Sequence, residues 1–186
     1  LLEFLHPGQF VLFSSPVYGG TDHFIKHVLP KWGINHASFD ANDSEEDIHR
    51  IIQTHGADKL GLVYIETPAN PTNALIDMEM CARVAAAYST EERKVVLAVD
   101  NTYMGPLWSH PLKHGADIVV YSATKYIGGH SDVIAGAVLS NAAIMQRIKG
   151  MRTFMGNMMS PNTGWLLMRS LETLKPRMEL QAQNAI

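Results

Sequence analysis

Residues 117–131 read DIVVYSATKYIGGHS, an apolar run that leads into a loop of small and polar residues. The apolar part, 118–121, predicts a short strand buried within a sheet. Lys125 follows this strand by four residues and precedes a pair of glycines. Most lysines lie in solvent, whereas an amine at the end of a buried strand is desolvated and therefore nucleophilic. The stretch predicts a reactive lysine at a sheet edge, with a solvated loop lysine as the alternative.

Short apolar runs and amphipathic stretches alternate on both sides of this segment. The runs that predict strands occupy 10–14, 34–39, 60–65, 95–99, 118–121 and 134–139. Helical periodicity occupies 21–32, 44–52, 77–88, 141–148 and 160–174. The alternation predicts a three-layer α/β fold, a mostly parallel sheet with helices on both faces. Ligands of such sheets lie beyond the carboxyl ends of the strands, where Tyr18, Asn70, Asp100 and Lys125 all fall.

Several predicted helices begin at residues suited to capping. Ser44 and Asp47 make a near capping box, with Asp in place of the usual Glu. Asp77 and Asn141 precede helical stretches, and Ser160 is followed by a proline suited to the first helical position. These caps define where the helices that cover the sheet begin.

The two ends of the chain lack the usual helix boundaries. The first residues, LLEFL, come before His6-Pro7-Gly8, a pattern that ends helices, so we expect the chain to begin inside a helix. Residues 178–186 are helical in pattern and carry no stop signal. Both observations predict a piece of a longer polypeptide.

The composition excludes several classes of function. Of the 186 residues 46% are hydrophobic and 18% charged, and the net charge is −3, ordinary values for a globular domain with a substantial core. Without a basic stripe, nucleic-acid binding has no electrostatic support. No apolar run approaches the roughly 20 residues that span a membrane. The single cysteine, Cys81, excludes internal disulfides and favours a reducing compartment, the cytoplasm. We expect it in the core, and we expect no metal site.

Ser122 and Thr124 place hydroxyl groups next to Lys125. Hydroxyls in this position suit an anion such as a phosphate. An amine nucleophile beside a phosphate site suggests a Schiff base with pyridoxal phosphate.

The segment 117–131 resembles the pyridoxal-phosphate attachment segment of the Cys/Met-metabolism enzymes. This family includes cystathionine γ-synthase, the cystathionine lyases, methionine γ-lyase and O-acetylhomoserine sulfhydrylase. Further similar blocks follow the family's order: VYGGT at 17–21, ETPANPT at 66–72, VDNTY at 99–103, SPNT at 160–163 and RSLETL at 169–174. The resemblance implies the large domain of the fold-type I pyridoxal-phosphate-dependent transferases, an amino-acid substrate, and a homodimer or homotetramer.

The resemblance also implies how the chain is divided. Residues 1–176 would be the cofactor-binding large domain, incomplete at its N-terminus, and 177–186 the start of a helix leading to a missing C-terminal domain. Family members bind the phosphate with a helix start before residue 1 and with a Tyr-x-Arg segment of a neighbouring subunit. They hold the substrate carboxylate with an arginine of the C-terminal domain. None of these maps onto this chain, since Arg152, Arg169 and Arg177 lie in segments unlike that motif.

The resemblance assigns roles to six residues. Lys125 would attach the cofactor and afterwards act as a base. Asp100, at the end of an apolar strand, would pair with the protonated pyridine nitrogen, since an unpaired buried carboxylate is unfavourable; the alternative is a cap on the turn that follows. Ser122 and Thr124 would donate to the phosphate, with local turn bonding as the alternative.

The remaining two assignments concern loops after strands. Tyr18 would stack over the pyridine ring and transfer a proton to the leaving group, with a packed surface aromatic as the alternative. Asn70, restricted by the following proline, would lie near the cofactor's 3′-oxygen, with a turn asparagine as the alternative. Glu66, Tyr103 and His130 are weaker candidates, none of which we expect to be catalytic. Glu66 would support the Asn70 loop and Tyr103 would line the pocket, while His130, which follows two glycines, is equally explained as a structural histidine.

The implied activity is γ-elimination or γ-replacement, the cleavage or formation of a C–S bond on a sulfur amino acid or activated homoserine. Gly20 stands where methionine γ-lyases commonly carry cysteine, which favours cystathionine or a homoserine ester over methionine. The alternatives are methionine γ-lyase, aminotransfer, and a catalytically incomplete chain that only binds cofactor or assembles.

Overall fold

The computed structural model describes residues 1–186, and a six-stranded sheet forms its centre. The strands are β1 Phe10–Ser14, β2 Asn35–Phe39, β3 Leu60–Glu66, β4 Val96–Asp100, β5 Ile118–Ser122 and β6 Gly136–Ser140. Their order is β2-β1-β3-β4-β5-β6. The first five pair in parallel, and β6 pairs antiparallel with β5 at the edge. The predicted mostly parallel sheet is confirmed.

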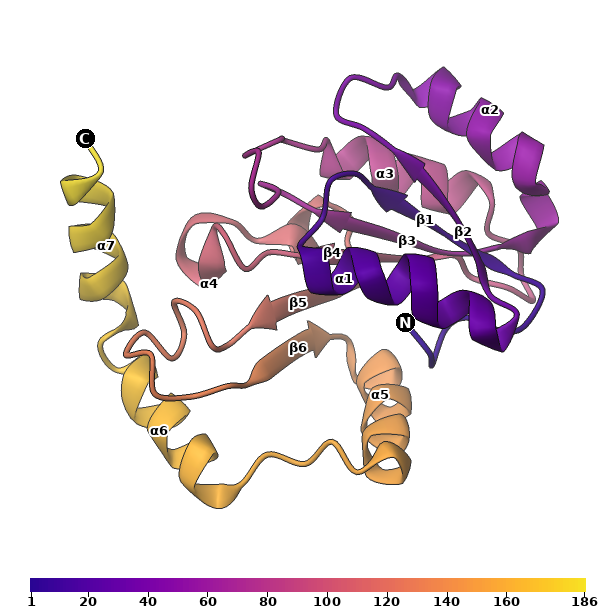
Figure 1. Ribbon diagram of the computed structural model, residues 1–186. Helices are drawn as coiled ribbons and strands as arrows, with labels where there is room; N and C mark the ends of the chain where they lie inside the picture. The colour runs from indigo at the N-terminus through magenta and orange to yellow at the C-terminus, as the bar shows by residue number, and fades with distance from the viewer.

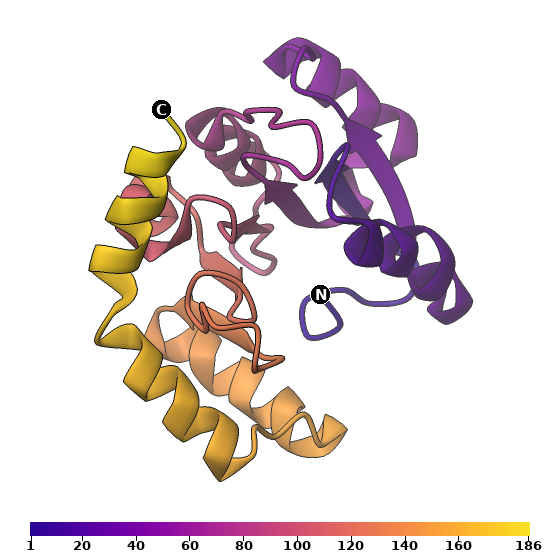
Figure 2. The ribbon, with the colours of Figure 1, turned by 60° about the vertical axis from the view of Figure 1, so that its left-hand side comes forward.

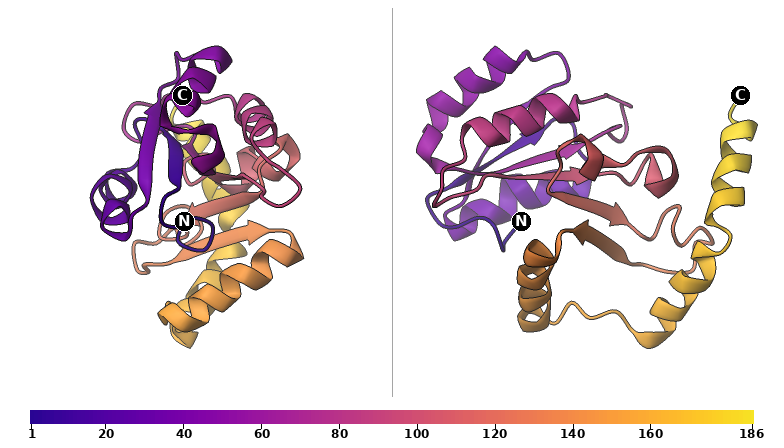
Figure 3. Two further views of the ribbon diagram at one scale, coloured as in Figure 1. Left: turned by 90° about the vertical axis from the view of Figure 1, so that its right-hand side faces the viewer. Right: turned by 180° about the vertical axis from the view of Figure 1, so that it is seen from behind.

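Helices cover both faces of this sheet, as Figures 1 and 3 show. They are α1 Gly19–His23, α2 Glu45–His55, α3 Met78–Ala87, α4 Gly105–Trp108, α5 Ala142–Met155, α6 Pro161–Leu171 and α7 Leu174–Asn184, with short turns of 3-10 helix at Ala57–Lys59 and Pro111–His114. α2 and α3 lie on one face, while α1 and α5 lie on the other. The three-layer arrangement is therefore the predicted one.

The alternation of side chains along β1 divides the core into two halves. Phe10 and Leu12 pack toward α2 and α3, whereas Val11 and Phe13 pack toward α5 and the helical turns 24–32 that continue α1. All four are at most 1% exposed, which explains why the strand is continuously apolar rather than alternating. Cys81 lies in the first half, 1% exposed, and burial raises the pKa of its thiol to about 12. It is the packed core residue that the sequence predicted.

The capping residues act as expected. Ser44 Oγ accepts from the Asp47 backbone N–H and the Asp47 carboxylate accepts from the Ser44 N–H, which completes the capping box. The side chains of Asp77, Asn141 and Ser160 likewise accept from the third residue of their helices. No helix in the structure combines the length and the apolar character needed to cross a membrane.

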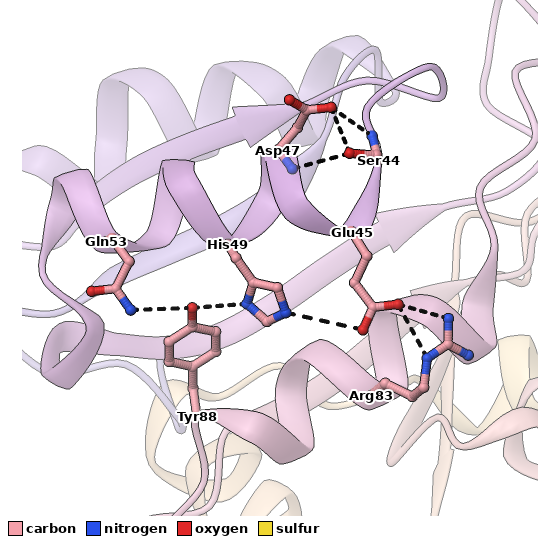
Figure 4. A network of polar contacts seen from close by, with 7 residues as sticks. All are labelled: Ser44, Glu45, Asp47, His49, Gln53, Arg83 and Tyr88. Atoms are coloured by element: carbon pink, nitrogen blue, oxygen red, sulfur yellow. Dashed lines mark hydrogen bonds and ion pairs between the residues drawn. The ribbon is translucent and has the colours of Figure 1, made fainter.

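α2 and α3 lie side by side, and a network of polar contacts joins them (Figure 4). Arg83 Nη2 lies 2.8 Å from Glu45 Oε2, and Tyr88 Oη lies 2.8 Å from His49 Nδ1. The residues of this network are exposed or partly buried, so the network joins the two helices near the surface and does not form part of the core.

Three predicted helices differ from the structure. Residues 2–4 form a turn rather than a helix, because Phe4 and Leu5 pack into the core beside β1. The predicted helix 21–32 starts earlier, at Gly19, and continues through a π-helical turn, Phe24–Val28, and a 3-10 turn, Leu29–Trp32. There Pro30 offers no N–H to a regular helix.

The predicted helix 160–174 instead ends at Leu171, and α7 begins at Leu174. Glu172 and Thr173 donate to carbonyls only three residues earlier, which tightens and stops α6. The break places Pro176 in the first turn of α7, where its missing N–H is tolerated. The division of the chain at residue 176 remains a prediction.

Candidate active site

A cavity of about 920 Å³ opens at the carboxyl ends of the parallel strands. α6 and α7 run along this edge of the sheet, as Figures 1 and 2 show. All six predicted site residues line the cavity. Its 15 lining residues are Tyr18, Glu66, Asn70, Asp100, Thr102, Tyr103, Ser122, Thr124, Lys125, Tyr126, Gly129, Ser131, Val133, Ile134 and Gln181. The fold thus brings together side chains that are more than 100 positions apart in the sequence.

Lys125 lies in a tight turn directly after β5. Its backbone N–H donates to the Ser122 carbonyl at 3.1 Å, and its own carbonyl accepts from Gly129 N at 2.7 Å. The side chain is exposed to the cavity, and its amine makes no hydrogen bond or ion pair within the chain. The expected desolvation of Lys125 is therefore wrong, because the turn directs the lysine into the cavity and away from the core. The geometry leaves the amine free to meet a ligand.

Asp100 ends β4 and is half-buried at the base of the cavity. Its Oδ1 accepts from Thr102 Oγ1 at 2.6 Å and from Thr102 N at 3.0 Å, while Oδ2 accepts from Tyr64 Oη at 3.2 Å. The turn cap that was the alternative reading is thus present. A carboxylate has about four lone-pair sites, so the cap leaves capacity for a cationic N–H donor.

Tyr64 is a site residue that the sequence reasoning missed. It is 6% exposed, and burial together with the charge of Asp100 raises the pKa of its phenol well above 10. The phenol therefore stays protonated and donates to Asp100. Tyr64 pairs with Ala98 across β3 and β4, and Asp100 lies two residues beyond Ala98 on the same face. Only the register of the two strands reveals this contact.

The two hydroxyl residues beside Lys125 differ in their availability. Thr124 Oγ1 donates to the Ala135 carbonyl at 3.2 Å and accepts from Ala135 N at 3.0 Å. The hydroxyl proton of Thr124 is therefore used in local hydrogen bonding, which was the predicted alternative to phosphate binding. The Ser122 hydroxyl has no partner in the chain, and its backbone N–H donates to Thr102 Oγ1 at 2.8 Å. Ser122 is thus the better placed of the two to donate to an anion.

Glu66 joins the two loops that carry Tyr18 and Asn70. Its Oε2 accepts from Tyr18 N at 2.6 Å, and its Oε1 accepts from Asn70 N at 2.9 Å. The residue is only 5% exposed, and burial raises the pKa of its carboxyl group, opposed by these two N–H donors and reinforced by the charge of Asp100. The expected support of the Asn70 loop is present, and the contact with Tyr18 extends it.

Tyr18 and two of the weaker candidates, Tyr103 and His130, differ in whether they line the cavity. The Tyr18 ring is 53% exposed and Tyr103 is 40% exposed, and both line the cavity. His130 does not line it: Nδ1 lies 2.7 Å from the Gly128 carbonyl and 3.4 Å from Ser170 Oγ. The His130 ring is therefore bonded within its own turn and to α6, which agrees with the structural alternative for this residue.

The donor set of this cavity fits pyridoxal phosphate. Lys125 supplies a free amine for an aldehyde carbon, and Asp100 supplies an oriented carboxylate for a ring nitrogen. Ser122 offers a free hydroxyl to a phosphate, and the exposed Tyr18 ring offers an aromatic face. The lining contains no arginine. Each functional group of the cofactor thus has a chemically suitable side chain on the cavity wall.

Comparison with known proteins extends this correspondence to the whole chain. The family model described as Cys/Met metabolism PLP-dependent enzyme matches residues 1–186. A cystathionine gamma-lyase of Bacillus subtilis is 36% identical over 186 residues, all of this chain and 46% of the relative. An L-methionine gamma-lyase of Pseudomonas putida is 34% identical over 187 residues and is covered to 44%.

A solved structure shows the same arrangement. The cystathionine gamma-lyase of Lactobacillus plantarum, complexed with L-serine, superposes with a TM-score of 0.81 at 31% identity over 92% of this chain and 42% of that one. The chain thus spans less than half the length of the proteins it resembles.

Proposed function

This chain belongs to the Cys/Met metabolism family of pyridoxal-phosphate-dependent enzymes, and on that premise we propose that the intact protein catalyses γ-elimination or γ-replacement on cystathionine or an activated homoserine. The observation that carries the proposal is the convergence of Lys125, Asp100, Tyr18, Asn70 and Ser122 on one cavity. We further propose that it works in the cytoplasm, because the single cysteine is a buried free thiol.

The chain's own residues supply binding and proton transfer. When bound, pyridoxal phosphate supplies an electrophilic carbon and a ring that withdraws electrons from the substrate's α-carbon. Lys125 Nζ would hold the cofactor, and its amine, once freed, would move the proton from the α-carbon. Asp100 would keep a proton on the ring nitrogen, oriented by Tyr64 and Thr102.

Two loop residues complete the proposed roles. The Tyr18 ring would stack against the cofactor, and its hydroxyl would deliver a proton to the leaving sulfur or oxygen. The Asn70 side-chain amide would donate to the cofactor's 3′-oxygen. Glu66 supports both roles, since its carboxylate holds the backbone of each residue. Ser122 would donate to the phosphate, and Thr124 could join it only by giving up its bond to Ala135.

Attachment at Lys125 can be tested directly. The intact protein, given the cofactor, should develop a visible absorption band that borohydride abolishes, and peptide mapping should find the reduced label on Lys125. Label on Lys113 or Lys149 would refute the assignment. Absence of any band would favour the alternative of a chain that serves assembly alone.

Asp100→Asn keeps the shape of the side chain and removes its charge. The value of kcat/KM should fall by about two orders of magnitude, as expected for loss of a charge-assisted hydrogen bond of ~2–3 kcal/mol. Asp58→Asn, an exposed substitution far from the cavity, is the matched control. Near-normal activity of Asp100→Asn would remove this residue from the mechanism.

Substrate preference distinguishes the proposal from methionine γ-lyase, the second candidate, which a 34% identical relative supports. The intact protein should show higher kcat/KM on cystathionine or an O-acylhomoserine than on methionine, because Gly20 carries no side chain beside the Tyr18 ring, where an added Cβ would lie 2.9 Å from Tyr18 Cε1. A preference for methionine would favour the second candidate.

A further inference from the structure

The turn that carries Lys125 lies outside the regular secondary structure, since residues 123–133 contain no strand or helix. Three backbone bonds close the turn: Lys125 N donates to the Ser122 carbonyl at 3.1 Å, while Gly128 N and Gly129 N donate to the Ala123 and Lys125 carbonyls, both at 2.7 Å. No strand ladder or helix fixes the residues after Lys125, so contacts from other elements contribute to the direction in which its side chain leaves the turn.

Arg177, on α7, supplies that external contact. Its Nη1 donates to the Tyr126 carbonyl at 2.8 Å, and its Nη2 lies 3.4 Å from the Ile127 carbonyl. Two residues of the α6–α7 junction hold the guanidinium in place: Nη2 donates to the Ser170 carbonyl at 2.8 Å, and Nε donates to Thr173 Oγ1 at 3.0 Å. One planar group thus bridges the two residues after Lys125 and the start of α7.

Gly129 permits the close approach of this guanidinium. A Cβ atom at position 129 would lie 2.0 Å from Arg177 Nη1 and 2.5 Å from Cζ. Gly129 also has a φ of +73°, which favours glycine. One of the two glycines in the segment 117–131 therefore makes room for Arg177.

α7 is fixed against the other side of the cavity as well. Met178, 3% exposed, packs on Gly105, where an added Cβ would lie 2.8 Å from Met178 Cε. Gln181, one turn further along, lines the cavity itself. Arg177 thus connects the Lys125 turn to a helix that also contacts the segment after Asp100.

From these contacts we propose that Arg177 is a positioning residue. Its guanidinium fixes the turn Tyr126–Gly129 and thereby sets the direction in which the Lys125 amine enters the cavity. The proposal rests on the proposed function for the role of Lys125, but the mechanical link itself involves only residues of this chain. A lysine at position 177 would not reproduce these contacts, because its three donors lie on one nitrogen, whereas those of Arg177 are spread over Nε, Nη1 and Nη2.

The first experiment measures hydrogen exchange in the cofactor-free intact protein. Arg177→Gln should speed exchange in peptides covering 123–130 by about 10-fold or more, as expected for loss of hydrogen bonds from a charged donor. Arg177→Lys should fall between this variant and the wild type. Arg169→Gln is the matched control, because Arg169 is exposed on α6 and its guanidinium makes no hydrogen bond or ion pair, lying 5.3 Å from the centre of the Trp165 ring. Exchange equal to that of the control would overturn the proposal.

The second experiment separates positioning from general stability. In the loaded protein, Arg177→Gln should lower kcat about 10-fold with little change in KM, and Arg177→Lys should recover part of the loss. Equal loss in the Gln and Lys variants, or a rise in KM alone, would contradict positioning.

If Arg177→Gln does not fold, Thr173→Val provides a second variant, because it removes the partner of Arg177 Nε and keeps the charge of Arg177. This variant should speed exchange in the same peptides by a smaller factor. Unchanged exchange in Thr173→Val would count against the proposal. If borohydride leaves Lys125 unlabelled in the wild type, the proposed function fails. The exchange data, taken without cofactor, still decide whether Arg177 holds the turn.

Discussion

At the scale of single residues, Glu66 holds the site together most directly. One buried carboxylate accepts backbone N–H groups from both the Tyr18 and the Asn70 loops. Both donors are backbone N–H groups, and both bond to the Glu66 carboxylate. The positions of the two loops therefore depend on this one acceptor. An amide at this position could accept only one of the two bonds, because its NH₂ group is a donor.

Glu66→Gln should change how the stability of the protein depends on pH. Because burial raises the pKa of this carboxyl group above 4.5 in the folded state, ionisation of Glu66 opposes folding. This unfavourable contribution is absent below pH 4.5 and becomes complete once the pH exceeds the folded-state pKa. The stability of the variant relative to the wild type should therefore rise with pH from 4.5 toward neutrality.

Urea unfolding at a series of pH values measures this difference. Glu91→Gln, an exposed loop substitution, is the control and should give a difference that stays flat. A flat difference for Glu66→Gln as well would show that this carboxylate ionises as readily in the fold as in the unfolded chain.

At the scale of elements, α2 is fixed by its N-terminal cap and by its contacts with α3. Ser44→Ala removes the side-chain acceptor for Asp47 N and the partner of the Asp47 carboxylate. The free energy of unfolding should fall by about 1 kcal/mol, the usual effect of losing such a cap. Chemical denaturation measures it. Ser38→Ala, at an exposed position of β2, is the control. An equal loss in both variants would mean that the cap contributes nothing specific.

At the scale of the whole molecule, we predict a dimer or tetramer for the intact protein. Ile134, on the cavity rim, is 92% exposed, and it lines one shallow hollow together with Met158 and Met159, which are 62% and 45% exposed. Exposed apolar side chains that gather in this way mark surfaces that pack against other chains. The cavity lining also contains no arginine for a phosphate, which suits completion of the site by a second subunit. Sedimentation together with kinetics tests this, and a fully active monomer would contradict it.

The element pattern and the identity of the main site residues could be predicted from the sequence because both depend on local chemistry. Continuous apolar runs such as 10–14 and 118–121 are compatible only with buried strands when helical stretches alternate with them. The caps at Ser44 and Asp77 depend on residues three positions away. Asp100 ends a strand and Lys125 lies a few residues after the next one, so their position at one edge of a parallel sheet was predictable, while their roles are those that the family resemblance implies.

The tertiary structure alone decided the contacts between distant segments. The bond from Tyr64 to Asp100 depends on the register of β3 against β4, and the bond from Arg177 to Tyr126 spans 51 positions. The exposure of Lys125 and the engagement of the Thr124 hydroxyl depend on the path of the chain after β5. The sequence by itself determined the sheet, its covering helices and which polar side chains lie at its edge, because periodicity and caps act over a few residues. The orientation of those side chains required the packed molecule, because the groups that orient them come from other elements of the fold.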